Sequence, residues 1–155
     1  MNFKYLSFFI LFFISFCINS QEMKEGFTYL ETGKYKKAES FFKEVLKTYP
    51  KNKTARLCYG RAIGLNGKSD KAVLLFTNLL KDYPSDFEVK LNYAESLLWS
   101  KNFLDAKVYY QTLLKENDKS FAALLGYANT LSNLKEDKSA LEYGDKALEV
   151  LPGKA

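Results

Sequence analysis

The chain has 155 residues, of which 47% are hydrophobic and 26% charged, so it is long enough for one modest domain and too apolar to be disordered. Its formal net charge of +5 is small, and Lys residues alternate with Glu and Asp along most of the chain, a pattern that argues against a nucleic-acid-binding face. Histidine is absent, which removes the commonest general base and the commonest metal ligand.

The first twenty residues have the features of an export signal. Lys4 supplies a positive start, residues 5–18 form an apolar run of about 14 residues, and Ser20 is a small residue before a cleavage point at Gln21. The run is shorter than the roughly 20 residues that a membrane-spanning helix needs. We therefore predict a cleaved signal peptide at 1–20 and an exported protein that is periplasmic, envelope-associated or secreted.

Two alternatives to cleavage stay open. An uncleaved segment would anchor the protein, and this is the only membrane association that we expect. Lipid modification at Cys17 is the second alternative, although Phe16 is bulkier than the Gly, Ala or Ser that precedes the cysteine in lipoprotein precursors.

From Asn19 onward the sequence repeats with a period of 34 residues. Four units follow without insertion or deletion, at 19–52, 53–86, 87–120 and 121–154, so a repeat domain is predicted for 21–155. Positions 8 and 20 of the unit are small, position 24 is aromatic in three units, and position 28 is Leu. A constant offset of this kind indicates stacked structural repeats. These packing columns contain Gly26, Gly60, Ala94 and Ala128; Ala38, Ala72, Ala106 and Ala140; Phe42, Phe76 and Tyr110; Leu46, Leu80, Leu114 and Leu148.

Each unit divides into two helices. Apolar residues recur at offsets of three and four, with none of the alternation typical of strands. Gly33 and Gly67 are expected to end the first helix of their pairs, because Gly accepts the left-handed backbone conformation. In the third and fourth units this site is Lys101-Asn102 and Lys135-Glu136, and we expect Asn102 to replace Gly at modest cost. The second helices are closed by Pro50, Pro84 and Pro152.

A helix–turn–helix unit with small residues at positions 8 and 20, an aromatic residue at 24 and proline at 32 resembles the tetratricopeptide repeat. The resemblance covers residues 19–154. It implies an all-α fold, a right-handed superhelical solenoid of about eight helices whose first helices line a concave groove. The residue pattern agrees, because a single helix pair could not bury its apolar columns without a neighbour.

The last unit departs from the pattern. Gly144 replaces the usual aromatic residue, and Leu141, Leu148 and Leu151 are expected to be partly exposed because repeats of this kind usually finish with an additional covering helix. Three explanations stay open: a fragment of a longer protein, a homodimer that buries the open end, or a helix exposed at some cost in stability.

The resemblance places ligand binding in the groove. Transfer of the inward positions of the first helices gives a largely apolar lining with Arg61, Glu95 and Asn129 at equivalent heights, which suits a peptide with apolar anchors. Trp99, the only Trp, has two candidate roles, packing between first helices and contact with a ligand. The candidate partner-binding residues are Phe27, Leu57, Arg61, Leu91, Glu95, Leu98, Trp99 and Asn129.

The carboxylate clamp of chaperone-binding relatives is not expected here. Its Lys and Arg positions are occupied by Met23, Phe27, Cys58, Glu88 and Asn92. Recognition of an acidic C-terminal tail is therefore not predicted.

No catalytic, metal or cofactor motif is apparent. There is no phosphate-cradling Gly-rich loop, no Gly-x-Ser-x-Gly and no Cys/His pair, and Cys58 is interpreted as a small buried residue rather than as a reactive thiol. The sequence thus predicts an exported, non-catalytic scaffold that binds a protein or peptide, with no nucleic acid or small-molecule substrate. The alternative is an interaction module of a larger envelope-associated protein, truncated at its C-terminus.

Overall fold

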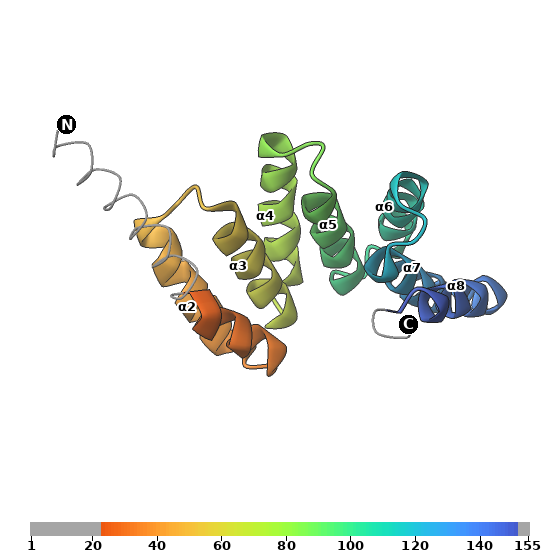
Figure 1. Ribbon diagram of the computed structural model, residues 1–155, viewed down its shortest axis with the longest axis horizontal. Helices are drawn as coiled ribbons and strands as arrows, with labels where there is room; N and C mark the ends of the chain where they lie inside the picture. The colour runs from red at the N-terminus through yellow and green to blue at the C-terminus, as the bar shows by residue number, and fades with distance from the viewer. Residues whose placement is uncertain (1–22, 152–155) are drawn as a thin grey trace, which may run out of the picture. The chain divides into compact units, whose positions relative to one another are not determined.

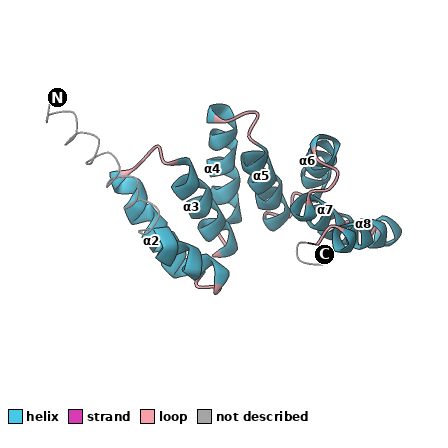
Figure 2. Ribbon diagram, in the orientation of Figure 1, coloured by secondary structure: helices cyan, strands magenta, loops and turns pink. Residues whose placement is uncertain are grey.

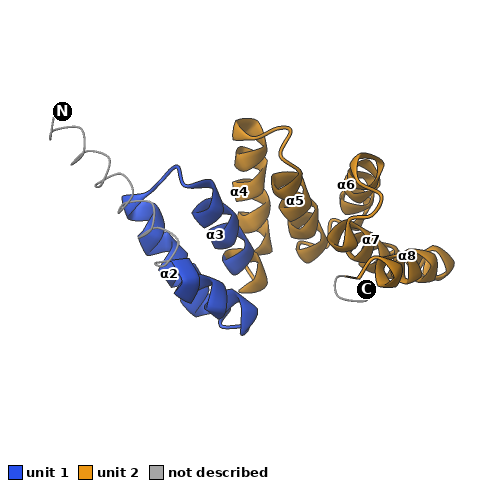
Figure 3. Ribbon diagram, viewed as in Figure 1, with its two compact units in different colours: residues 1–62 blue, residues 63–155 orange. Residues whose placement is uncertain are grey.

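The computed structural model describes residues 23–151, which are helical and contain no strand (Figures 1 and 2). The predicted signal peptide and Pro152 lie outside this range. The chain divides between Ala62 and Ile63 into two compact units (Figure 3). The all-α solenoid class expected from the sequence is confirmed.

The first unit contains helical residues 23–31, helix α2 (Tyr35–Thr48) and most of helix α3 (Lys53–Leu65). Its core includes Ala38 and Phe42, from the small and aromatic columns of the repeat. Phe42 is fully buried, its ring centroid lies 5.3 Å from that of Phe41, and the two rings meet edge to face. The buried members are Met23, Ala38, Phe42, Ala55, Cys58 and Ala62.

The second unit contains the end of α3 and five further helices: α4 (Ser69–Asp82), α5 (Phe87–Trp99), α6 (Phe103–Glu116), α7 (Phe121–Asn133) and α8 (Asp137–Glu149). Helix α5 packs against α4, α6 and α7, and α7 packs against α6 and α8.

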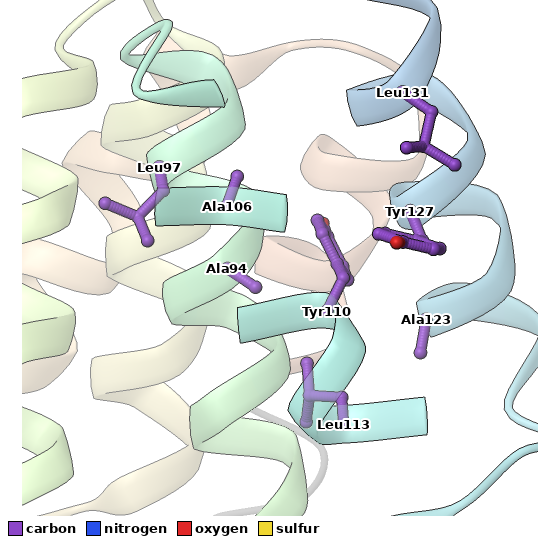
Figure 4. Close-up of a cluster of buried hydrophobic side chains, with 8 residues drawn as sticks. All are labelled: Ala94, Leu97, Ala106, Tyr110, Leu113, Ala123, Tyr127 and Leu131. Atoms are coloured by element: carbon purple, nitrogen blue, oxygen red, sulfur yellow. The ribbon is translucent and has the colours of Figure 1, made fainter. Parts of the chain in front are cut away.

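The core of the second unit forms between α5, α6 and α7 (Figure 4). Figure 4 shows the Tyr110 ring of α6 beside Tyr127 of α7, and both belong to the same buried cluster. A β-carbon built on Gly126 would lie 2.4 Å from Tyr110 Cζ, so the ring packs directly on the α7 backbone. The cluster contains Ala94, Leu97, Ala106, Tyr110, Leu113, Ala123, Tyr127 and Leu131.

The turn inside each helix pair has the same backbone at intervals of 34 residues. Gly33, Gly67, Lys101 and Lys135 have φ values of 71°, 81°, 64° and 63°, in the left-handed region. After each of them a backbone N–H reaches five residues back, for example from Lys34 to the Tyr29 carbonyl at 2.8 Å and from Glu136 to the Leu131 carbonyl at 3.0 Å. This is the Schellman arrangement that satisfies the last carbonyls of a helix.

The expectation that Asn102 takes the left-handed position was wrong. Lys101 takes it, and Asn102 instead precedes α6, where its amide donates to the Ser100 hydroxyl at 2.9 Å. The physical reason is that six-residue closure between the Asn102 N–H and the Leu97 carbonyl requires the left-handed residue immediately before Asn102. The backbone geometry of the repeat therefore overrides the intrinsic preference of Asn.

Three first helices begin at a side-chain cap that sequence reasoning did not identify. Asn52 Oδ1, Asp86 Oδ1 and Ser120 Oγ accept hydrogen bonds from the backbone N–H three residues later, at 2.9, 3.1 and 3.3 Å. These residues are also 34 apart, and Asn, Asp and Ser are the preferred N-cap types. The signal was present in the sequence as a polar residue two positions after position 32 of the unit, which is Pro50, Pro84 or Asp118.

Candidate functional site

The predicted groove residues of the second unit lie on two helices that contact each other, α5 and α7. Leu91, Glu95, Leu98 and Trp99 of α5 are half-buried, and Asn129 of α7 is exposed. Leu125 of α7, which is 41% exposed, is the most exposed of the large apolar side chains on these two helices. We call the surface made by Leu91, Glu95, Leu98, Trp99, Leu125 and Asn129 the α5–α7 face.

Trp99 ends α5 and packs on Gly64 of α3. A β-carbon built on Gly64 would lie 2.4 Å from Trp99 Cε3 and 3.2 Å from the Ala72 β-carbon. The missing side chain at Gly64 thus creates the space that the indole occupies. The packing role expected for Trp99 is present, and its half-buried state leaves part of the ring accessible.

The α7 side of this face is polar beyond Leu125. Asn129, Ser132 and Asn133 are exposed, and the Asn133 amide donates to the Asn129 carbonyl at 2.8 Å. Ser132 and Asn133 stand near the end of α7, so the accessible surface changes along the helix from apolar to amide and hydroxyl groups. Such a surface offers one apolar contact beside several hydrogen-bonding groups.

The other three predicted residues lie in the first unit. Phe27 is half-buried, and its ring centroid lies 6.0 Å from that of Phe42. Leu57 is only 2% exposed, which leaves little of its side chain for a partner to contact. Arg61 is exposed on α3.

Three exposed apolar side chains on second helices were not anticipated. Leu74 of α4, Leu104 and Val108 of α6 are 65%, 70% and 60% exposed. Leu74 and Val108 occupy the same position of the 34-residue period. The helical pattern identified the buried side of these helices, but it gave no reason to expect apolar residues on the opposite side.

A cavity of about 430 Å³ adjoins Val108. It lies between the end of α4, the start of α5 and the side of α6, and its walls are mostly apolar. Lys90 Nζ bridges to Glu116 Oε1 at 2.8 Å on the lining, so the charged groups present there form an ion pair. Burial, with the neighbouring Tyr93 as a smaller cause, raises the pKa of Tyr109 in the same wall. The lining residues are Leu80, Pro84, Lys90, Val108, Tyr109, Thr112, Leu113 and Glu116.

Metal-binding and membrane-spanning features are not found in the described part of the chain. Residues 23–151 contain no cluster of three or more Cys, His, Asp or Glu placed to hold a metal ion. None of the helices in that range has the length and apolar character needed to cross a membrane. Cys58 is 8% exposed, as expected for a small packed residue.

The sequence profile of the Iml2/Tetratricopeptide repeat protein 39 family matches residues 4–152, nearly the whole chain. The chain belongs to this family. Its matched range begins inside the segment for which a signal peptide is predicted. No protein sequence of curated function is similar enough to this tetratricopeptide-type protein to count as a match.

Solved structures share the fold at low sequence identity. A fragment of MamA from Desulfovibrio magneticus RS-1 matches with a TM-score of 0.67 and 15% identity, over 86% of this chain and 75% of that one. Cut9–Hcn1, a hetero-tetramer of the APC/C, matches with a TM-score of 0.66 and 15% identity, over 83% of this chain and 25% of that one. A tetratricopeptide repeat protein from Parabacteroides merdae ATCC 43184 matches with a TM-score of 0.60 and 22% identity, over 88% of this chain and 54% of that one.

Proposed function

We propose that this protein is an exported, non-catalytic scaffold whose four 34-residue repeats bind a protein or peptide segment on the inward side of the first helices. The observation that carries this proposal is the α5–α7 face. Two first helices contact each other there and leave accessible a half-buried Trp99 and a 41% exposed Leu125. Large aromatic and apolar side chains of this kind commonly anchor protein interfaces.

The chemistry of the face favours a segment with an apolar anchor and polar flanks. Leu91, Leu98 and Leu125 supply apolar contact. Glu95 follows Leu91 by four residues, and Asn129 follows Leu125 by four, so each polar residue is a neighbour of a leucine on the same side of its helix. An extended or helical peptide that places one apolar side chain between the helices would also meet the hydrogen-bonding groups at the end of α7.

The similar structures support an assembly role without defining the partner. Cut9–Hcn1 is a hetero-tetramer, so a related helical fold is used within a protein complex in that case. The alternative proposal is that the present chain is the interaction module of a larger envelope-associated protein or complex. A reading frame that continues past Ala155 would favour this alternative.

Site-specific photocrosslinking tests the position of the interface. A crosslinking amino acid replaces Leu125 on the α5–α7 face or, as a matched exposed leucine elsewhere in the same unit, Leu104 on α6. In the native cell, the Leu125 variant is expected to capture a discrete partner that the Leu104 variant does not. A Trp99→Ala, Asn129→Ala double variant carrying the Leu125 probe is expected to lose that product.

The crosslinking products at Leu125 and Leu104 decide which side of the repeat domain binds the partner. Capture from Leu104 and none from Leu125 would place binding on the outer side of the second helices and contradict the groove proposal. A folded double variant that crosslinks as strongly as the unmodified face would do the same. Helical circular dichroism of each variant shows whether the repeat domain is intact.

Export is tested separately by the mass of the mature N-terminus. A chain that begins at Gln21 in the envelope or secreted fraction supports the proposed signal peptide. An intact Met1 in that fraction would instead show that residues 1–20 are retained as an anchor.

A further inference from the structure

We propose that α8 is a self-association surface, through which two copies of the chain pair their α8 helices antiparallel about a two-fold axis. The proposed surface does not involve the α5–α7 face. Leu141, Gly144 and Leu148 follow one another at spacings of three and four residues and so lie on one side of α8, where they form what we call the apolar stripe. Leu141 is 71% and Leu148 is 53% exposed.

The same positions are covered in the preceding helix pairs. Leu80 and Leu114, which correspond to Leu148, are only half-exposed or less, and Leu114 packs against the core cluster. Tyr110 and Phe76, which correspond to Gly144, are fully buried. Helix α8 therefore presents to solvent a side that its equivalents use for packing, as the sequence led us to expect for Leu141 and Leu148.

Gly144 gives the stripe its shape. A β-carbon built at Gly144 meets no atom within 4 Å among the described residues, so the backbone of α8 lies open at the middle of the stripe. Another helix approaches closely where a glycine replaces a larger side chain. In an antiparallel pair, Leu148 of each copy lies against Gly144 of the other, and Leu141 packs beside them.

A head-to-tail arrangement that continues the solenoid is disfavoured by charge. At the junction of α6 and α7, the Gln111 amide donates to the Tyr127 hydroxyl at 2.9 Å. Asp145 is the equivalent of Gln111 one repeat later, and Glu25 is the equivalent of Tyr127 three repeats earlier. These two residues would meet if α8 of one copy packed on the first helix of another. Both are exposed carboxylates, and their apposition in a closed interface is unfavourable.

A two-fold arrangement has better charge complementarity. Lys138 and Glu149 stand near opposite ends of the same edge of the stripe and are exposed. Antiparallel pairing brings Lys138 of one copy toward Glu149 of the other, and symmetry forms this contact twice. Asp145 stands on the same edge near the two-fold axis, where it approaches its own symmetry mate. Lys146 is turned to its own helix, since its Nζ lies 2.7 Å from Glu142 Oε1.

The oligomeric state of the full chain, processed as in the cell, tests this proposal. Sedimentation over a range of concentrations is expected to show a reversible dimer. Leu148→Glu places two charges in the seam and is expected to weaken dimerisation at least about tenfold, because each charge is desolvated without a partner. Leu104→Glu is the matched control, since Leu104 is also exposed, at 70% against 53% for Leu148, but lies on α6. It is expected to leave the dimer unchanged.

Asp145 distinguishes this geometry from other dimers. Asp145→Asn is expected to tighten the dimer by relieving repulsion across the two-fold axis, and Asp145→Cys is expected to form a disulfide-linked dimer under mild oxidation. A chain that stays monomeric throughout overturns the proposal. So does a dimer that is insensitive to Leu148→Glu, is lost equally with Leu104→Glu, or is weakened by Asp145→Asn.

Discussion

Tyr110 of α6 and Gly126 of α7 form a matched pair, in which the glycine provides the space for the tyrosine ring. The ring is fully buried, and the built β-carbon at Gly126 lies 2.4 Å from Tyr110 Cζ and from its hydroxyl oxygen. The close approach of α6 to α7 depends on both residues.

Gly126→Ala is expected to destabilise the protein by about 1–3 kcal/mol, because a buried ring cannot move aside without disturbing the core. Urea unfolding followed by circular dichroism measures the change. Gly144→Ala is the matched control and is measured in the Leu148→Glu background, so that pairing of α8 does not contribute. Nothing in the described part of the chain lies within 4 Å of its built β-carbon and Ala favours a helix, so this variant should be unchanged or more stable than Leu148→Glu alone. A folded Gly126→Ala chain as stable as the unmodified protein would contradict the packing described.

Tyr110→Phe is expected to keep or raise stability. The buried Tyr110 hydroxyl has no hydrogen-bond partner among the described residues, so its removal eliminates an unsatisfied group worth about 1–3 kcal/mol. Tyr127→Phe is the comparison, because it removes the hydrogen bond from Gln111 and should not stabilise. A clear loss of stability in Tyr110→Phe would show that the hydroxyl is satisfied.

The burial of Tyr110 is expected to make the stability of the folded protein sensitive to alkaline pH. Burial raises the pKa of Tyr110 well above its usual value, with the Glu95 charge as a smaller cause. The neutral phenol is thus favoured in the folded state, and the corresponding stability is present below about pH 10 and is lost as pH rises above it. The stability difference between the unmodified chain and Tyr110→Phe should grow by about 1.4 kcal/mol for each pH unit above 10. Equal pH profiles for the two proteins would rule out Tyr110 as the cause.

Lys101 and Lys135, whose backbones are in the left-handed conformation, are positions at which a substitution should stabilise the protein. Lys101→Gly and Lys135→Gly are each expected to raise the free energy of unfolding by about 1 kcal/mol, because a residue with a β-carbon is strained at positive φ. Both side chains are exposed, so little contact is lost. Lys43→Gly, at an exposed position inside α2, is the control and should destabilise by a similar amount. The opposite order in thermal or urea unfolding would contradict the assigned backbone.

The caps of the first helices provide a further test. Asp86→Ala and Ser120→Ala are each expected to cost about 1 kcal/mol, since the N–H groups of Val89 and Ala123 lose an acceptor. Lys34→Ala is the control, because Lys34 is exposed and precedes α2 without a side-chain cap, and it should have little effect. Urea midpoints of the three variants give the comparison, and equal values would show that the caps contribute nothing.

The sequence by itself determined the periodic part of this protein. Helical spacing, small and aromatic columns and the glycines at Gly33 and Gly67 depend on local backbone preference and on burial that every copy shares. These features were sufficient to predict the all-α solenoid, the buried Cys58 and the exposed Leu141 and Leu148. They also indicated the helices on which Trp99 and Asn129 lie.

Only the tertiary structure decided which neighbours each residue meets. Lys101 rather than Asn102 is left-handed because hydrogen-bond closure of the turn sets the conformation, and Leu57 is buried although its position in the repeat predicted an accessible side chain. The packing of Trp99 on Gly64 and the cavity beside Val108 arise from contacts between separate helices. Periodicity specifies the side of a helix that packs, but exposure depends on the volume and position of the residues that pack against it.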